Sequence, residues 1–152
     1  MVKKVSLLLQ HRDVQILNAA LALERRTVAA YTAGIPLLPW SMAKTAKQFL
    51  NEELQHTGEL LALIKAAGGI APPRADSYAI GHPHDAGGVL RLLHQLESTQ
   101  IAGYLRAIPR LSPGPLRAEV ASVLANDAQH LSILRLAQGT NPLPSAFVTG
   151  RE

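Results

Sequence analysis

The chain has no cysteine and few aromatic residues, and these shortages exclude several kinds of protein. Without cysteine it can form no disulfide scaffold, and no iron–sulfur or other thiolate metal site. Aromatic residues make up only 4% of the chain, so leucine, isoleucine, valine and alanine must build the core. Because alanine and leucine lead the scale of helix propensity, this composition favours packed helices over strands.

Charged residues and long apolar runs are also scarce. Charged residues are 17% of the chain, and the net charge of +4 comes from lysines and arginines that are scattered rather than clustered. No basic patch interleaved with aromatic residues is present, so we expect no nucleic-acid partner. The apolar run at residues 5–9 is too short for a secretory signal, and no stretch approaches the ~18 apolar residues of a membrane span. We therefore expect a cytoplasmic protein.

Glycine and proline divide the 152 residues into four segments with helical periodicity. Short turns join the first segment to the second and the third to the fourth, which predicts two antiparallel hairpins. The linker at residues 70–84 is long enough to run the whole length of a bundle. We expect one all-α domain over residues 1–152, a four-helix bundle with a long crossover. Its expected helices span about 13–33, 42–67, 86–108 and 113–138, with Asp13 and Ser112 as caps and an extended tail at 140–152.

An acidic residue interrupts the apolar stripe of every expected helix. Following each stripe in alternating steps of three and four residues places these acids among core positions. In two helices a histidine follows the acid three residues later, on the same helix face. The six residues are Glu24, Glu53, His56, Glu97, Asp127 and His130.

The same residues belong to an internal repeat. The Leu-Glu pair that ends at Glu24 has a tyrosine seven residues later, and this pattern recurs at Glu97, an offset of 73 residues. The acid-x-x-His pair that begins at Glu53 recurs at Asp127, an offset of 74 residues. Two copies of one helical hairpin would therefore place four carboxylates and two imidazoles around one point of the core.

Buried carboxylates need counter-charge, because an uncompensated buried charge costs several kcal/mol or takes up a proton. Two divalent cations would cancel four carboxylate charges, and two neutral imidazoles would complete their coordination. Oxygen ligands with imidazole suit iron or manganese, and zinc can occupy such sites adventitiously. The alternative is a protonated, hydrogen-bonded polar layer in the core.

This pattern resembles that of the ferritin-like di-iron carboxylate proteins, in which two helices carry a Glu and two others a Glu-x-x-His. The match covers residues about 12–138. Asp127 departs from it, being one methylene shorter than the usual Glu, and an asymmetric site or unequal metal affinities would follow. The resemblance implies two terminal carboxylates, two terminal imidazoles and two bridging carboxylates: respectively Glu24 and Glu97, His56 and His130, and Glu53 and Asp127.

Polar residues one or two turns from the ligands are expected to support them. Tyr31 and Tyr104 should pack in the core with their hydroxyls bonded to ligand carboxylates, an electron-transfer role being the alternative. Gln100 should hydrogen-bond a carboxylate or hold an ordered water, and Thr27 should line the site.

Three further polar residues lie near the ligands in the expected bundle. His94 and Glu59 each lie one turn from a ligand, and either an additional ligand or a surface residue would fit the spacing. Glu52 is expected to face solvent.

Redox chemistry at a di-metal centre is the leading functional hypothesis. Two Fe(II) ions that share a carboxylate can pass two electrons to O₂ or peroxide, which one ion cannot easily do. The resemblance implies ferroxidase, oxidase or peroxide-reducing activity, with a dimanganese catalase-like centre as a variant. The alternative is a metal-binding or structural stress protein without turnover, as in ferritin-like families associated with desiccation.

The expected assembly is a homodimer that packs through an apolar outer helix face. A storage cage is disfavoured because storage ferritins seal their shell with a fifth helix, whereas a short proline-containing tail follows the fourth helix here. Since the absence of cysteine excludes a rubredoxin-like domain, electrons for repeated turnover must come from an external donor.

Overall fold

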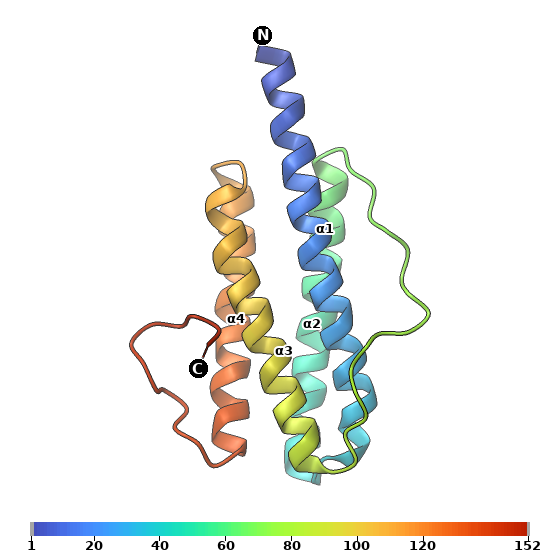
Figure 1. Cartoon of the computed structure of the whole chain (residues 1–152), viewed down its shortest axis with the longest axis vertical. Coiled ribbons are helices and arrows are strands. Elements are labelled where there is room, and N and C mark those ends of the chain that lie inside the picture. The colour runs from blue at the N-terminus through green and yellow to red at the C-terminus, as the bar shows by residue number, and fades with distance from the viewer. Residues whose placement is uncertain (1, 152) are drawn as a thin grey trace.

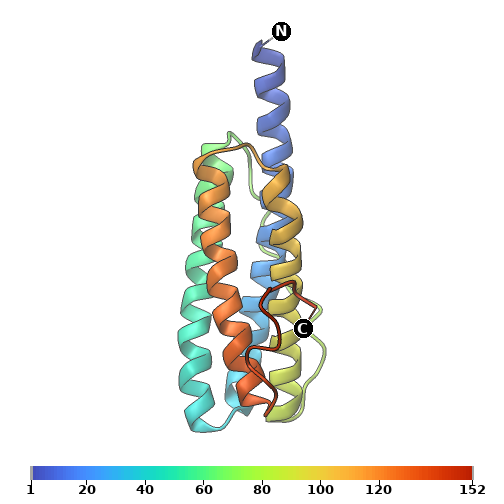
Figure 2. The same ribbon diagram turned by 90° about the vertical axis from the view of Figure 1, so that its left-hand side faces the viewer.

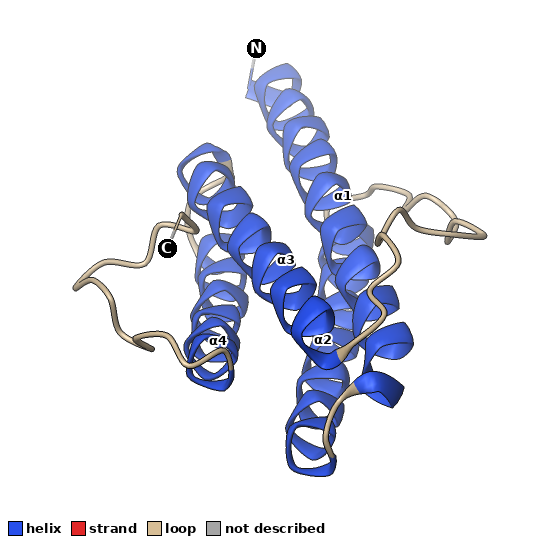
Figure 3. Cartoon of the chain, turned by 60° about the horizontal axis from the view of Figure 1, so that its bottom comes forward, coloured by secondary structure: helices blue, strands red, loops and turns tan. Residues whose placement is uncertain are grey.

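The computed structural model describes the backbone of residues 2–151 and the side chains of residues 10–151. Over these residues the chain is helical and contains no β-strand (Figures 1 and 3). Its helices are α1 (Val2–Gly34), α2 (Trp40–Ala66), α3 (Ala86–Ala107) and α4 (Pro115–Ala137), with short 3₁₀ turns η1 (Ile35–Leu37) and η2 (Ile108–Arg110).

The helices form a four-helix bundle of two antiparallel hairpins, which confirms the expected fold class. α1 packs against α2 and α3 packs against α4, while α1 also lies along α3. Residues 67–85 connect α2 to α3 by running along the outside of the bundle from one end to the other (Figure 1). None of the described helices is long and apolar enough to cross a membrane.

Two adjacent arginines of α1 hold the crossover against the bundle. Arg25 Nη1 donates to the carbonyl oxygens of Pro72 and Pro73, at 2.7 and 3.1 Å, and Arg26 Nε donates to Ala79 O at 2.8 Å. A proline-containing segment has few backbone donors of its own, so side chains of a neighbouring helix satisfy its carbonyls. This pair of basic residues therefore has a structural role.

Two expected helix starts are wrong. α1 begins at Val2 rather than near residue 13, because no glycine or proline interrupts residues 2–12, and its first turns project beyond the bundle (Figures 1 and 2). Asp13 is buried inside α1, where its Oδ1 accepts a hydrogen bond of 3.0 Å from Ser112 N. α4 is capped by Gly114, whose φ of 100° suits glycine, and begins at Pro115 rather than near Ser112.

The tail after α4 folds back over the bundle without regular structure (Figure 2). Its Gly150 lies directly on α3, where an added Cβ would come within 2.3 Å of the carbonyl oxygen of Ser98. A side chain at this position would therefore push the tail away from the helix.

The core consists of two apolar clusters that lie on either side of a polar layer. One contains Phe49, Leu93 and Leu96, and the other contains Leu17 and Leu60. Burying a leucine or phenylalanine side chain contributes about 1.5–3 kcal/mol, so the two clusters can offset the cost of the polar layer between them. The clusters also separate that layer from the two ends of the bundle.

Candidate metal centre

All six residues expected as metal ligands lie in the polar layer. α1 and α3 each bring one carboxylate to it, whereas α2 and α4 each bring a carboxylate and an imidazole. The four carboxylate residues are 0% exposed, and the two histidines are 8% and 1% exposed. In chain order they are Glu24, Glu53, His56, Glu97, Asp127 and His130.

The six side chains form two overlapping groups of four. In each group one ligand atom from every residue lies within 4.8 Å of the others, and Glu53 and Asp127 belong to both groups. Two ions bridged by two carboxylates would need this overlap. The first group is Glu24, Glu53, His56 and Asp127, and the second is Glu53, Glu97, Asp127 and His130.

Both histidines direct Nδ1 toward the carboxylates. His56 Nδ1 lies 3.4 Å from Asp127 Oδ1 and 3.7 Å from Glu24 Oε2, whereas His130 Nδ1 lies 3.2 Å from Glu53 Oε1. Ligand atoms about 2.1 Å from one ion are about 3–3.5 Å from each other, because the angles at the ion are near 90–110°. The observed separations are close to that range.

The atoms that face the middle of the layer have no hydrogen-bond partner among the described residues. Leaving a buried polar atom unpaired costs about 1–3 kcal/mol, and several at one point call for a shared partner. A pair of divalent cations fits this donor set in charge and in ligand type. The unpaired atoms are Glu24 Oε2, Glu53 Oε1, His56 Nδ1, Glu97 Oε2 and both Oδ atoms of Asp127.

The remaining carboxylate oxygens are fixed by hydrogen bonds that cross between helices. Tyr31 of α1 donates its hydroxyl hydrogen to Glu97 Oε1 of α3 at 2.6 Å, and Tyr104 of α3 donates to Glu24 Oε1 of α1. Gln100 Nε2 donates to Glu53 Oε2 at 3.1 Å. Each of the three glutamates thus keeps one oxygen bonded to the protein and one directed into the layer, whereas Asp127 directs both of its oxygens there without a hydrogen-bond partner among the described residues.

Thr27 completes this network. Its hydroxyl donates to Gln100 Oε1 at 2.8 Å, which orients the amide of Gln100 so that its nitrogen faces Glu53. Thr27 and Gln100 occupy matching positions of the two repeats, 73 residues apart. The repeat therefore extends from the ligands to the residues that hold them.

Burial and mutual repulsion shift the pKa values of the acidic side chains in the layer. Burial, followed by the charge of Glu53, raises the pKa of Glu24 to about 8 and that of Glu97 to about 7. Burial also raises the pKa of Asp127 well above its usual value, and the charges of Glu24 and Glu97 add to the effect. Burial alone would raise the pKa of Glu53, but close contacts with the imidazoles of His130 and His56 bring it below its ordinary value.

The pKa values of both histidines are raised, whereas burial by itself lowers the pKa of a base. Burial lowers their pKa, but contacts with Glu24 and Glu53 raise the pKa of His56 to about 9. Contacts with Glu53 and Glu97 likewise raise the pKa of His130 to about 10. Without metal, the layer therefore holds protons at neutral pH in place of cations.

Contrary to the expectation that it faces solvent, Glu52 lies against His130. It is half-buried, and its Oε2 lies 2.7 Å from His130 Nε2. A hydrogen bond from Nε2 to this carboxylate leaves Nδ1 of His130 free to bind a metal, which is how outer carboxylates orient ligating histidines. Sequence reasoning missed this residue because the contact joins α2 to α4, and periodicity within one helix cannot reveal it.

His94 and Glu59 belong to neither group of ligand atoms. His94 lies beside Arg135 of α4, with 3.5 Å between His94 Nε2 and Arg135 Nη1. Glu59 is exposed and lines a groove of about 390 Å³ between α2 and α4. Glu52, Glu119 and His56 also line this groove, so an acidic path leads from the surface to the His56 side of the layer.

Replacing Glu52 with Gln is expected to weaken the binding of one of two metal ions by about tenfold or more, because the outer partner of His130 loses its charge. Isothermal titration with Mn(II) would measure the change. Glu59→Gln is the matched control, since it removes an acid from the same groove without touching His130. Equal effects of the two substitutions would contradict a positioning role for Glu52 and indicate general attraction by the groove.

Proteins of known structure share this fold. A conserved hypothetical protein of Mycobacterium tuberculosis has a similar structure, with a TM-score of 0.81, 20% identity and coverage of 90% of this chain and 97% of that one. A ferritin-like, diiron-carboxylate protein of Bacillus anthracis gives a TM-score of 0.76, 18% identity and coverage of 85% and 96%. No curated protein matches the sequence. The ferritin-like domain family, however, matches residues 12–140, which is most of the chain, and the protein therefore belongs to that family.

Proposed function

We propose that this protein binds two divalent metal ions and that the bound ions react with O₂ or peroxide. Iron is the metal we propose, and manganese is its variant. The observation that carries the proposal is the set of six unpaired ligand atoms in a buried layer flanked by two apolar clusters. The donor set supports iron or manganese because it combines carboxylate oxygen with imidazole and lacks thiolate. The description of the Bacillus anthracis neighbour as a diiron-carboxylate protein favours iron.

Each ligand has a proposed place. Glu24 with His56 would hold one ion, Glu97 with His130 the other, and Glu53 with Asp127 would be shared between them. Two bound Fe(II) ions would supply the two electrons that reduce O₂ or peroxide. Tyr31, Tyr104 and Gln100 would keep the carboxylates in place through the hydrogen bonds described above.

An anaerobic Fe(II) titration followed by exposure to O₂ tests this proposal. We expect two iron ions per chain by elemental analysis, and oxygen consumption when O₂ is admitted. One ion per chain would identify Asp127, the shorter bridge, as the weak ligand. Absence of binding would overturn the proposal, and binding without oxygen or peroxide consumption would favour the non-catalytic, desiccation-type alternative.

Metal affinity is expected to rise with pH. Because the pKa values of Glu97 and Glu24 are about 7 and 8 and those of the histidines are higher, the metal-free layer must release protons when ions bind. Each released proton makes binding about tenfold tighter per pH unit, until the pH exceeds the pKa of its group. Mn(II) titrations at pH 6.5 and 7.5 should differ by at least about tenfold, and equal affinities would contradict the proton-filled layer.

The homodimer and the cytoplasmic location stay predictions, as does an external electron donor. Light scattering after size exclusion would separate a dimer from a cage. The large apolar side chains that α2 and α4 leave exposed, and that a dimer could cover, are Trp40, Leu54, Leu61, Ile133 and Leu136.

A further inference from the structure

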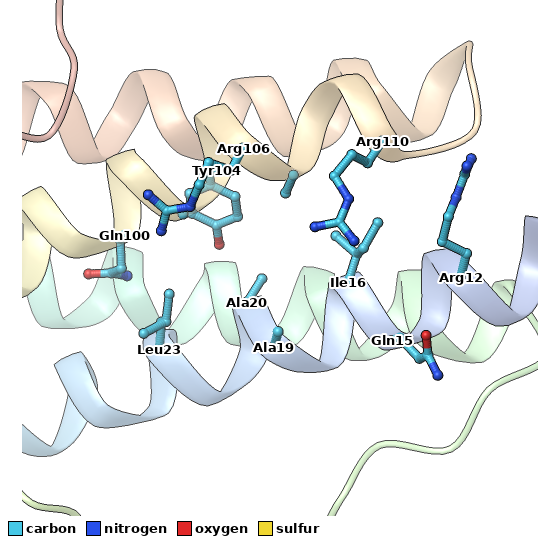
Figure 4. A pocket seen from close by; sticks show the side chains of 12 residues that line it. Arg12, Gln15, Ile16, Ala19, Ala20, Leu23, Gln100, Tyr104, Arg106 and Arg110 are labelled. Carbon is cyan, nitrogen blue, oxygen red and sulfur yellow. The ribbon is translucent and has the colours of Figure 1, made fainter.

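A second cavity lies between α1 and α3, away from the acidic groove. It has a volume of about 300 Å³ and extends along both helices (Figure 4). Its residues on α1 run from Arg12 to Leu23, a rise of about 16 Å at 1.5 Å per residue. This size is near the lower end of the ~300–1,000 Å³ of small-molecule sites, and the shape is elongated.

One strip of the cavity wall is apolar and includes small residues such as Ala19, Ala20 and Gly103. Ile16, Ala19, Ala20 and Leu23 of α1 line one side (Figure 4). On α3 the facing residue Gly103 approaches so closely that an added Cβ would come within 3.1 Å of Leu23 Cδ1. Such a strip suits an apolar ligand body that fits between two helices.

Three arginines border the cavity: Arg12, Arg106 and Arg110, all exposed. No carboxylate is among the described residues that line it. Among the described residues these three guanidinium groups have no ion pair or hydrogen bond, whereas others, such as Arg25, donate to backbone carbonyls. In Figure 4, Arg110 and Arg12 lie toward one end of the cavity, whereas Arg106 lies beside Tyr104 toward the other end.

The other end of the cavity reaches the supports of the metal centre. Gln100 and Tyr104 line it there, and both are at least 97% buried. Gln100 bonds to Glu53 and Tyr104 to Glu24, so a ligand in the cavity would lie one side chain from the polar layer.

We propose that this cavity binds a small organic carboxylate with an unbranched apolar tail. The carboxylate lies at the Arg12–Arg110 end, and the tail lies along Ile16, Ala19 and Leu23 toward Tyr104. An inorganic anion would leave the apolar strip unused, and a neutral apolar molecule would leave the arginines without a partner. The proposal uses no metal ligand as a contact and so does not depend on the proposed redox function.

Decanoate is a suitable probe, with decanol as its neutral counterpart. Isothermal titration should give saturable one-to-one binding of decanoate, about tenfold tighter than that of decanol, because charge-assisted hydrogen bonds to arginine are absent for the alcohol. The double variant Arg12→Gln/Arg110→Gln should weaken decanoate binding about tenfold or more. Arg91→Gln, which removes one charge from an exposed position of α3 that does not line the cavity, should leave it unchanged.

A second variant tests the apolar strip. Ala19 is exposed on α1, so Ala19→Leu should fold normally while filling the cavity and weakening decanoate binding by a similar factor. Each of the following results would overturn the proposal: no saturable binding of decanoate, equal binding of decanol, or an equal effect of Arg91→Gln. A change of oligomeric state in Ala19→Leu would overturn it as well, and would identify the cavity as an interface between copies of the chain. Metal-free and Mn(II)-loaded protein should bind decanoate alike, so a failure of the metal proposal would leave this result standing.

Discussion

Replacing both His56 and His130 with glutamine is expected to reduce the iron bound after anaerobic loading from two ions per chain to none. Each histidine supplies the only nitrogen of its ligand group, and both present Nδ1 to the carboxylates. Either single substitution should leave one ion. Elemental analysis of protein passed over a desalting column would measure the bound iron.

The choice of glutamine protects the fold in this experiment. His130 is 1% exposed and stacks on Phe49 with 4.1 Å between ring centroids, so alanine would leave a cavity next to the centre. His84→Gln, in the exposed crossover, is the matched control and should retain two ions. If the double variant retained two ions with normal circular dichroism, the assignment of both histidines as ligands would be wrong.

Replacing Glu24 with glutamine is expected to stabilise the metal-free protein at pH 7 by about 3 kcal/mol. The pKa of Glu24 is raised to about 8 in the fold, whereas the unfolded chain ionises it near 4.5. Each pKa unit between 4.5 and the working pH costs the folded state about 1.4 kcal/mol. Glutamine has nearly the same shape, keeps an oxygen that can accept the hydrogen bond from Tyr104, and carries no charge.

The pH dependence gives this prediction its sign. A carboxyl group whose pKa is raised by folding does not lower the free energy of unfolding below pH 4.5. The loss of stability grows as the pH rises to about 8 and is constant above that pH. The advantage of Glu24→Gln should therefore disappear at pH 4. Thermal unfolding in the presence of a chelator should show an increase of about 5–10 °C in Tm at pH 7.

Metal loading should reverse the effect. In the Mn(II)-loaded protein the same substitution removes a ligand, and each tenfold loss of affinity lowers the stability gained from binding by about 1.4 kcal/mol. Glu59→Gln is the control, because an exposed side chain should change stability by less than about 0.5 kcal/mol in either state. A metal-free Glu24→Gln protein less stable than the parent would contradict the account of a polar layer whose carboxyl groups must take up protons on folding.

The sequence was sufficient to predict the architecture. Glycine and proline positions separate four amphipathic segments, and the lengths of the linkers between them leave few ways to connect a bundle. Helix ends were less predictable because they depend on single residues. Asp13 is of a residue type that often caps helices, but its carboxylate accepts a hydrogen bond from Ser112 N instead. The cap of α4 is Gly114 rather than Ser112.

The residues of the polar layer were predictable for a similar reason. An acid on an apolar stripe is conspicuous within one helix, and the repeat marks which acids correspond. Their burial confirms that Glu24 and the other five expected ligands lie in the core. The Fe(II) titration tests their role as ligands.

What the sequence by itself determined is therefore the set of four helices and the composition of the layer between them, because both are encoded in local spacing. The tertiary structure alone decided which partners meet across helices: Tyr31 with Glu97, Tyr104 with Glu24, and Glu52 with His130. It also decided that three arginines border one apolar cavity. These contacts depend on how the helices are rotated and offset against one another, and the packing of the whole core fixes those two quantities at once.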